Sequence, residues 1–236
     1  EIRYFVGTMN EKYQFVPEHG GSIDYGEFFA SQISFDEKGR TLLWGWLREM
    51  PRNLLYTDGE WAGVQAIPRV ISLDEKNQLV IKRLPELESL RKESEKVELK
   101  DFSGRHIFEM RSNTAEITAE VDTEEVFGIR VLASEDGKEY TDIIVEPETG
   151  IMKALLRESS TLEEVDKNML KGVFRKRSDG KILVDILIDC SVIEAFINDN
   201  GCISPRVYPT LEGKQISFWT EGKVKEAKIN VYEMEL

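Results

Sequence analysis

Short runs of β-branched and aromatic residues recur along this chain, and turn-forming residues separate one run from the next. The turns include Asp36-Glu37-Lys38-Gly39, Glu135-Asp136-Gly137, Ser178-Asp179-Gly180 and Asp199-Asn200-Gly201. The runs are Arg3–Thr8, Ala30–Phe35, Thr41–Leu47, Arg69–Leu73, Leu79–Arg83, Ile107–Met110, Glu116–Val121, Val126–Ala133, Thr141–Val145, Ile151–Leu156, Lys181–Ile188, Val192–Ile197, Ile203–Tyr208, Gln215–Trp219 and Glu226–Tyr232. This spacing predicts an all-β chain of antiparallel strands.

One segment, Leu84–Lys96, departs from this pattern. Its leucines at 84, 87 and 90 have helical spacing, Pro85 suits the first turn of a helix, and a run of charges follows. We expect a short helix and linker over residues 84–96. This segment would separate a first part, residues 1–83, from a second part, residues 97–236, which has the length of a complete β-sandwich.

The charge of the chain limits its partners. The 236 residues carry a net charge of −13 and the sequence pI is about 4.8. This balance argues against nucleic acid or an anionic membrane as partner, and no apolar run approaches the roughly 18 residues of a membrane span. The chain opens at Glu1 and enters a strand almost at once, which is typical of a piece of a longer protein.

Cysteine and histidine are scarce. The turn Asp199-Asn200-Gly201 is expected to pair Cys202 with Asn198, which leaves Cys190 too distant for a disulfide. Free thiols weakly favour a reducing, cytoplasmic compartment. With only two histidines, in unrelated segments, we predict no metal site and no cofactor.

The stretch Asp24–Leu47 concentrates aromatic residues around one carboxylate. Its six aromatic side chains are those of Tyr25, Phe28, Phe29, Phe35, Trp44 and Trp46. Aromatic rings stack on the C–H faces of sugars, and a carboxylate accepts hydrogen bonds from sugar hydroxyls. The stretch therefore indicates a sugar pocket.

Several collinear motifs resemble glycoside hydrolase family 32, the β-fructofuranosidases, which include invertases, levanases, inulinases and sucrose-6-phosphate hydrolases. The segments that carry the resemblance are YFVGTMNEKYQFVP, DYGEFFASQISF, GRTLLWGWL, WAGVQAIPRVISL, GIRVLASEDGKEYTDI and DCSVIEAFINDNGCISPRVYPT. They extend over nearly the whole chain. The resemblance implies the last blade of a five-bladed β-propeller followed by a C-terminal β-sandwich.

The catalytic motifs of that family are absent from this sequence. The family's nucleophile lies in an NDPNG run, its transition-state stabiliser in Arg-Asp-Pro and its acid/base in Glu-Cys, and none of the three occurs here. Retaining hydrolysis needs two carboxylates about 5–5.5 Å apart. We therefore expect no catalytic residue in this chain. It would be the C-terminal portion of a retaining β-fructosidase that hydrolyses O-glycosyl bonds of sucrose or fructans, inactive alone.

Four residues are candidates for substrate binding through the resemblance. Asp24 matches the Asp of the family's DYG segment, with turn capping as the alternative. Trp46 would wall the fructosyl subsite, although it and Trp44 also suit packing between blades. Phe29 stands where the family commonly has Tyr, so a hydroxyl is absent at this position. Glu27 lies where relatives vary. It could affect the choice of substrate or be an exposed charge at the end of a strand, and both interpretations are equally open.

In the sandwich we expect a structural ion pair. Counting outward from the turn at 199–201 pairs Glu194 with Arg206 across two strands, with Glu194 on the same face as Val192 and Phe196. The polar residues around Cys190 shift the strand alternation there and indicate a β-bulge.

Three functions compete. The first is the fructosidase fragment. Its partners would be the missing propeller blades or another chain, and an oligomer is possible on this interpretation. A lone blade exposes apolar faces, so residues 1–83 should be covered by a partner or by the sandwich, or be partly disordered. The second is a lectin-like sandwich; its only tryptophan within residues 97–236 is Trp219, which gives little support. The third is a structural or oligomerisation module.

Overall fold

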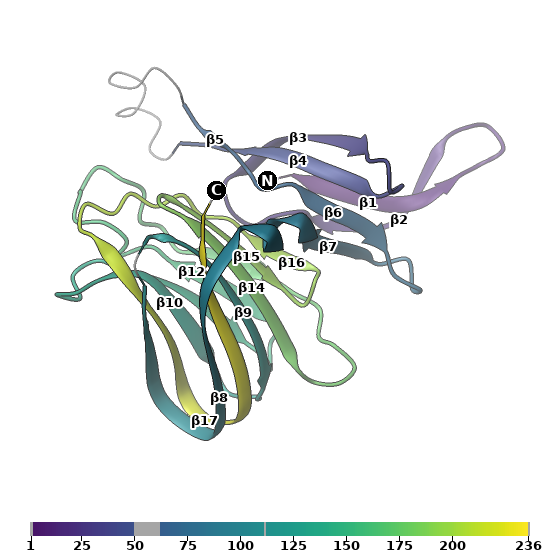
Figure 1. Cartoon of the computed structure of the whole chain (residues 1–236). Helices are drawn as coiled ribbons and strands as arrows, with labels where there is room; N and C mark the ends of the chain where they lie inside the picture. Colours follow the sequence, from purple (N-terminus) through teal and green to yellow (C-terminus); the bar gives the residue numbers. More distant parts are fainter. Residues whose placement is uncertain (1, 50–61, 111, 236) are drawn as a thin grey trace.

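The computed structural model describes residues 2–49, 62–110 and 112–235, and the described chain is almost entirely β-strand (Figure 1). Trp61, the first residue of the WAG motif, lies outside the described residues. Two bodies are visible, a smaller one built from the N-terminal residues and a larger sandwich built from the remainder. No helix among the described residues is long and apolar enough to span a membrane.

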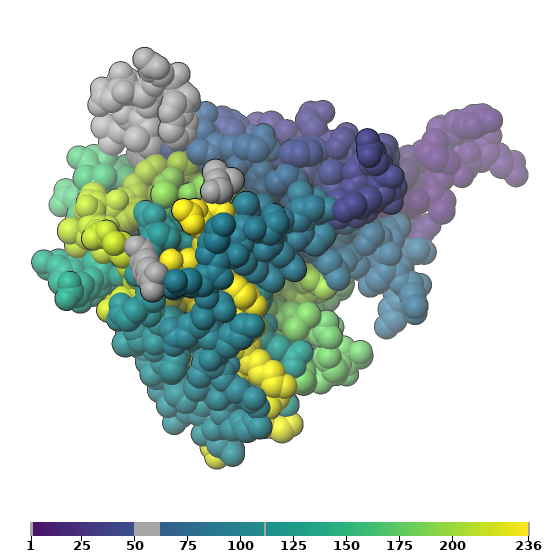
Figure 2. Space-filling view, viewed as in Figure 1, coloured from purple at the N-terminus to yellow at the C-terminus, as the bar shows by residue number. Residues whose placement is uncertain are grey.

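The smaller body contains a hairpin and a blade. The hairpin strands are β1 (Arg3–Met9) and β2 (Phe15–Ser22), and they pair only with each other. The blade has the order β3-β4-β6-β7, with β5 beside β4; its strands are β3 (Phe28–Phe35), β4 (Thr41–Leu47), β5 (Val64–Gln65), β6 (Arg69–Leu73) and β7 (Leu79–Arg83). Figure 2 shows the hairpin standing out from the remainder of the molecule.

The segment between blade and sandwich is only partly helical. Pro85–Leu90 form a short 3₁₀ helix, η1, with Pro85 in its first turn, as the sequence predicts. Residues 91–96, expected in a helical linker, are instead the start of strand β8 (Arg91–Glu109). Their charges suit a strand because β8 lies at the side of β17, where Lys96 pairs with Asn230.

The sandwich is held together by two long strands, β8 and β17 (Gly213–Met234). Residues 213–220 of β17 pair with β10, and residues 226–233 pair with β9, while β8 follows β17 along nearly its whole length. The two strands thus belong to both layers (Figure 1). The other strands are β9 (Thr114–Asp122), β10 (Phe127–Ser134), β11 (Thr141–Glu146), β12 (Ile151–Leu155), β13 (Leu170–Val173), β14 (Ile182–Asp189), β15 (Val192–Ile197) and β16 (Gly201–Ile203).

Two hydrophobic clusters follow from the period-two alternation of these strands. The main core lies between the layers, where alternate residues of β9 and β14 such as Ile117 and Ile186 are fully buried. The second cluster joins the bodies, because Leu43 and Leu47 of the blade pack in one group with Leu187 and Phe196 of the sandwich. The sandwich therefore covers one face of the blade.

The region around Cys190 differs from expectation. Residues 190 and 191 form the two-residue turn of a hairpin between β14 and β15, in which Asp189 faces Val192, so the predicted β-bulge is wrong. Cys190 has a φ of 53°, as turns of this kind require. Cys190 and Cys202 are both free, as predicted, although Cys202 pairs with Phe196 and not with Asn198.

Candidate functional site

Phe29 and Trp46 are cross-strand neighbours at one end of the blade. They face each other across β3 and β4, and the register shifts immediately after Phe29, where Ala30 has a φ of 51°. A bulge of this kind re-aims the side chains beside it. Phe29 is 42% exposed, and Gly63 lies so close beneath the Trp46 indole that a Cβ there would come within 1.7 Å of its nitrogen. The two rings form a wall, and its tryptophan, Trp46, packs against the backbone of Gly63.

A salt bridge borders this wall. Nη2 of Arg48 lies 2.8 Å from Oε2 of Glu27, and the Arg48 guanidinium is 5.2 Å from the centre of the Phe29 ring. Glu27 is largely buried, so the alternative of an exposed strand-end charge does not hold. Glu27, Phe29, Trp46 and Arg48 together form the surface we call the wall.

Asp24 lies behind the wall, out of solvent. Its Oδ1 accepts hydrogen bonds from the backbone N–H of Gly26 at 2.7 Å and of Ser204 at 3.1 Å. Its Oδ2 accepts from Oγ of Ser204 at 2.7 Å and from Nη2 of Arg69 at 2.8 Å. The turn-capping alternative therefore describes one of its contacts, and the contact of Asp24 with a sugar stays a prediction.

Arg69 connects the blade to the sandwich through two carboxylates. Its Nη2 is 2.8 Å from Asp24 and 2.9 Å from Glu194, which lies on β15. The rings of Phe28 and Phe196 flank the guanidinium at 4.0 and 5.2 Å. Burial disfavours the charge of Arg69, but the two carboxylates outweigh it and raise its pKa. Burial also raises the pKa of Glu194, against the opposing effect of Arg69.

The predicted pair between Glu194 and Arg206 is wrong. Phe196 faces Cys202 and Val192 faces Arg206, so the register differs by two from the one that joins Asn198 to Cys202. The turn has the expected three residues but lies one position earlier, at 198–200 between the paired Ile197 and Gly201, with Asn198 and Asp199 both at positive φ. The predicted face is confirmed, since Glu194 points to the blade together with Val192 and Phe196.

Arg206 has a different carboxylate partner. Its Nη1 lies 3.1 Å from Oε1 of Glu49, which follows β4, and the hydroxyl of Tyr208 donates to Oε2 of Glu49 at 2.7 Å. The backbone N–H of Gly63 donates to the same carboxylate at 3.0 Å. Glu49 and Arg69 thus both join the smaller body to the sandwich by ion pairs, Glu49 as the carboxylate and Arg69 as the cation. Neither was predicted from the sequence. A signal in the sequence is their position: Arg69 lies within the WAGVQAIPRVISL motif, and Glu49 lies two residues after the GRTLLWGWL motif.

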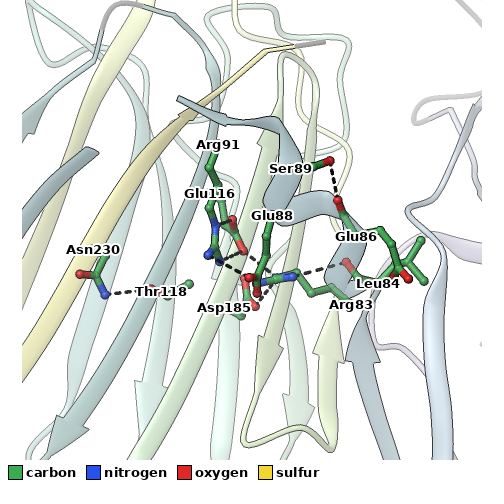
Figure 3. Close-up of polar contacts among 10 residues, drawn as sticks. All are labelled: Arg83, Leu84, Glu86, Glu88, Ser89, Arg91, Glu116, Thr118, Asp185 and Asn230. Atoms are coloured by element: carbon green, nitrogen blue, oxygen red, sulfur yellow. Dashed lines mark hydrogen bonds and ion pairs between the residues drawn. The ribbon is translucent and has the colours of Figure 1, made fainter. Parts of the chain in front are cut away.

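A second ionic cluster lies farther along the same seam (Figure 3). Nε of Arg83 is 2.6 Å from both Oε1 of Glu116 and Oδ2 of Asp185, and Nε of Arg91 is 2.5 Å from Oε2 of Glu116. Glu88 completes the cluster through Nη2 of Arg83 at 2.9 Å. Burial, with Glu116 adding to it, raises the pKa of Asp185 to about 7 despite the opposing effect of Arg83. Oδ1 of Asp185 is buried and has no hydrogen-bond partner.

Ion pairs limit the chemistry open to the carboxylates at the wall. Its carboxylate, Glu27, is ion-paired with Arg48, and Asp24 behind it is ion-paired with Arg69. A glycosidase pair needs one carboxylate poised as nucleophile and one carboxyl group that holds a proton, and neither residue is free for such a role. Within the described residues no group of His, Cys, Asp and Glu is arranged to hold a metal ion.

Comparison with known proteins follows the same division of the chain. A protein-family model described as "Glycosyl hydrolases family 32 N-terminal domain" matches residues 1–83, and one described as "Glycosyl hydrolases family 32 C terminal" matches residues 86–233. The chain is 32% identical over 263 residues to beta-fructofuranosidase, insoluble isoenzyme 1, of Daucus carota, which covers 88% of this chain and 44% of that protein. It is 28% identical to fructan 1-exohydrolase of Leymus chinensis, with 97% of this chain and 50% of that protein covered.

Solved structures share the fold. Fructan 1-exohydrolase IIa from Cichorium intybus superposes with a TM-score of 0.84 at 23% identity, covering 98% of this chain and 54% of that one. Exo-inulinase from Aspergillus awamori superposes with a TM-score of 0.82 at 17% identity, covering 99% and 50%. The predicted fold, a last propeller blade followed by a β-sandwich, is confirmed.

The chain spans about half the length of the curated relatives it matches. The two family models match adjoining residue ranges in chain order, and together they include nearly every residue from the hairpin to the end of β17. The motifs, the blade, the sandwich and these matches agree: the chain belongs to glycosyl hydrolase family 32.

Proposed function

We propose that the whole protein is a retaining β-fructosidase that hydrolyses O-glycosyl bonds of sucrose or fructans, and that this chain supplies part of its substrate pocket together with the bracing sandwich. One observation carries the proposal: the family's N-terminal and C-terminal models match this chain side by side, in that order. The relatives' names support the substrate class, since they include beta-fructofuranosidases and fructan exohydrolases. A neighbour is described in complex with 1-kestose.

In this proposal the wall contacts the fructosyl unit. Trp46 and Phe29 offer ring faces to its C–H groups, and Glu27 and Arg48 offer a charged acceptor and donor to its hydroxyls. Asp24 supports the wall from behind, because its carboxylate holds the start of β3 to Ser204 and Arg69.

The catalytic carboxylates would come from an upstream segment that completes the propeller. The blade keeps apolar side chains on both faces of β3 and β4, as expected of a blade that lacks its neighbour: Ile33 and Phe35 are 59% and 76% exposed, and Trp44 is 37% exposed. The hairpin β1–β2 adds Phe5 and Tyr13, at 62% and 87% exposure. These surfaces support the upstream blades, or another chain, as the partner.

Reconstitution tests the proposal. The chain is joined to, or mixed with, the upstream segment that carries the NDPNG, Arg-Asp-Pro and Glu-Cys motifs, and release of fructose from sucrose and inulin is measured. We expect hydrolysis from the joined protein and none from this chain alone. Hydrolysis by this chain at the rate of the joined protein would show that the catalytic groups lie within it.

A further inference from the structure

Trp219 lies flat on the outer surface of the sandwich. Phe218 beside it points into the core, so the alternation of β17 turns Trp219 outward. Trp219 pairs with Gly128 of β10, and a Cβ at residue 128 would come within 2.5 Å of two indole ring atoms. The indole therefore covers the bare backbone of β10, and one ring face rests on the sheet.

A hydrogen-bonded chain fixes the ring in this position. The indole N–H donates to Oδ1 of Asp142 at 3.1 Å, and Nε and Nη2 of Arg130 donate to the two oxygens of Asp142 at 2.9 and 2.8 Å. The Arg130 guanidinium in turn lies 3.4 Å from the centre of the Tyr140 ring. Trp219, Asp142, Arg130 and Tyr140 form what we call the outer platform, in which the indole of Trp219 has little freedom left to lose on binding.

The outer platform faces away from the blade. The blade packs on the layer that contains β14 and β15, whereas Trp219 and Arg130 are on the layer of β10 and β11. Beside Trp219 on the same face lies Arg105 of β8, which is exposed, and beside Ser217 lies Ile107, which is 50% exposed. A ligand on this face would contact residues other than those of the wall.

The charges around the ring indicate a neutral ligand. The carboxylate of Asp142 is matched by Arg130, and the nearby Lys153 is matched by Glu146, so both ion pairs are complete without a ligand. The chain as a whole carries a charge of −13, which disfavours polyanions. A fixed aromatic face bordered by satisfied polar groups is suited to the C–H face and hydroxyls of a sugar.

We propose that the outer platform is a binding site for a neutral oligosaccharide, with Trp219 as the stacking residue and Arg105 and Arg130 as hydrogen-bond donors to its hydroxyls. The proposal goes beyond the proposed function, because binding here requires neither the upstream segment nor the wall. It would give the sandwich a carbohydrate-anchoring role of its own.

The test measures binding to the full chain by calorimetry, with inulin, levan and malto-oligosaccharides as separate neutral probes and heparin as the acidic one. Trp219→Ala should weaken binding of the preferred neutral probe about tenfold, which corresponds to 1.4 kcal/mol. Trp44→Ala is the matched control, because Trp44 is an exposed tryptophan on the blade, and it should leave the affinity unchanged. Circular dichroism and thermal unfolding confirm that each variant is folded.

A second variant keeps the test decisive if Trp219→Ala unfolds. Gly128→Ala retains the tryptophan but places a methyl group under the indole, so it should tilt the ring and weaken binding while the tryptophan count stays the same. Three results would overturn the proposal: affinity unchanged in both variants, binding of heparin alone, or no binding of any neutral probe by the unaltered chain. None of these bears on hydrolysis by the joined protein, so the two proposals fail separately.

Discussion

Arg69 of the blade and Glu194 of the sandwich meet at 2.9 Å with both side chains shielded from water. Their contact is more than a pair, because the same Nη2 also reaches Asp24 and the hydroxyl of Ser204. A buried charge is tolerated only where partners compensate it. The position of the blade on the sandwich is therefore set by electrostatic satisfaction as well as by the apolar cluster around it.

Replacing Arg69 should destabilise the folded chain strongly. Arg69→Leu leaves the carboxylates of Asp24 and Glu194 buried without their cation, a change that costs about 3–5 kcal/mol in comparable buried pairs. Urea unfolding followed by fluorescence measures the loss. Lys225→Ala removes the exposed partner of Asp122 and should change the midpoint little. Equal effects of the two substitutions would contradict the central role of Arg69.

Asp185 should make stability depend on pH. Its pKa is raised to about 7 in the folded chain, whereas an unfolded Asp titrates near about 3.9. The folded state thus binds the extra proton, so the stabilising contribution is complete below the unfolded pKa and is lost as pH rises through about 7. Unfolding free energies measured across this range should fall with pH more steeply in the unaltered chain than in Asp185→Asn. Parallel slopes in the two proteins would show that Asp185 does not carry the effect.

Glu139 should hold three loops together. Its buried carboxylate accepts hydrogen bonds from the backbone N–H groups of Thr161, Thr210 and Leu211 and from the Thr210 hydroxyl. Glu139→Ala leaves those donors unpaired, and we expect a loss of about 2–3 kcal/mol. Hydrogen exchange should rise in residues 158–162 and 208–212 before it rises in the core strands. Protection that is unchanged there would mean that other contacts hold the loops.

Trp46 should affect catalysis in the reconstituted protein and not folding of this chain. Trp46→Ala removes the larger ring of the wall, and we expect kcat/KM for sucrose to fall about tenfold, equivalent to about 1.4 kcal/mol of lost binding to the transition state. Trp46→Phe should recover part of the loss because it restores a ring face. Unchanged kcat/KM in Trp46→Ala would remove this residue from the pocket.

Strands rich in β-branched, aromatic and other apolar residues were predictable from sequence, and strands rich in charge were not. Thr41–Leu47, Leu79–Arg83 and Val192–Ile197 have the bounds that their patterns predict. Residues 91–106 of β8 were missed because a long partner strand, invisible in local sequence, stabilises a segment of low intrinsic strand propensity. Phe15–Ser22 was missed because Pro17 and two glycines weaken its signal.

The candidate site was predicted less completely. Motifs located Asp24, Glu27, Phe29 and Trp46 in one part of the chain, but Asp24 has partners far away in the sequence, Ser204 and Arg69. The Glu194 prediction failed because the turn lies one residue earlier than expected, which moves every cross-strand partner by two positions while it preserves the face. Local sequence patterns specify well which face of a strand a side chain lies on. They specify only weakly which residue is its partner on another strand.

The continuity of β8 and β17 through both layers has a mechanical consequence. Their ladder runs from Gln215 opposite Glu109 to Met234 opposite Arg91, close to the C-terminal end. Because antiparallel hydrogen bonds lie perpendicular to the strands, tension along β17 loads many of these bonds in parallel shear instead of peeling them one at a time. Because β17 pairs with β10 in one layer and with β9 in the other, the layers cannot separate unless the hydrogen bonds of β17 to one of these strands break.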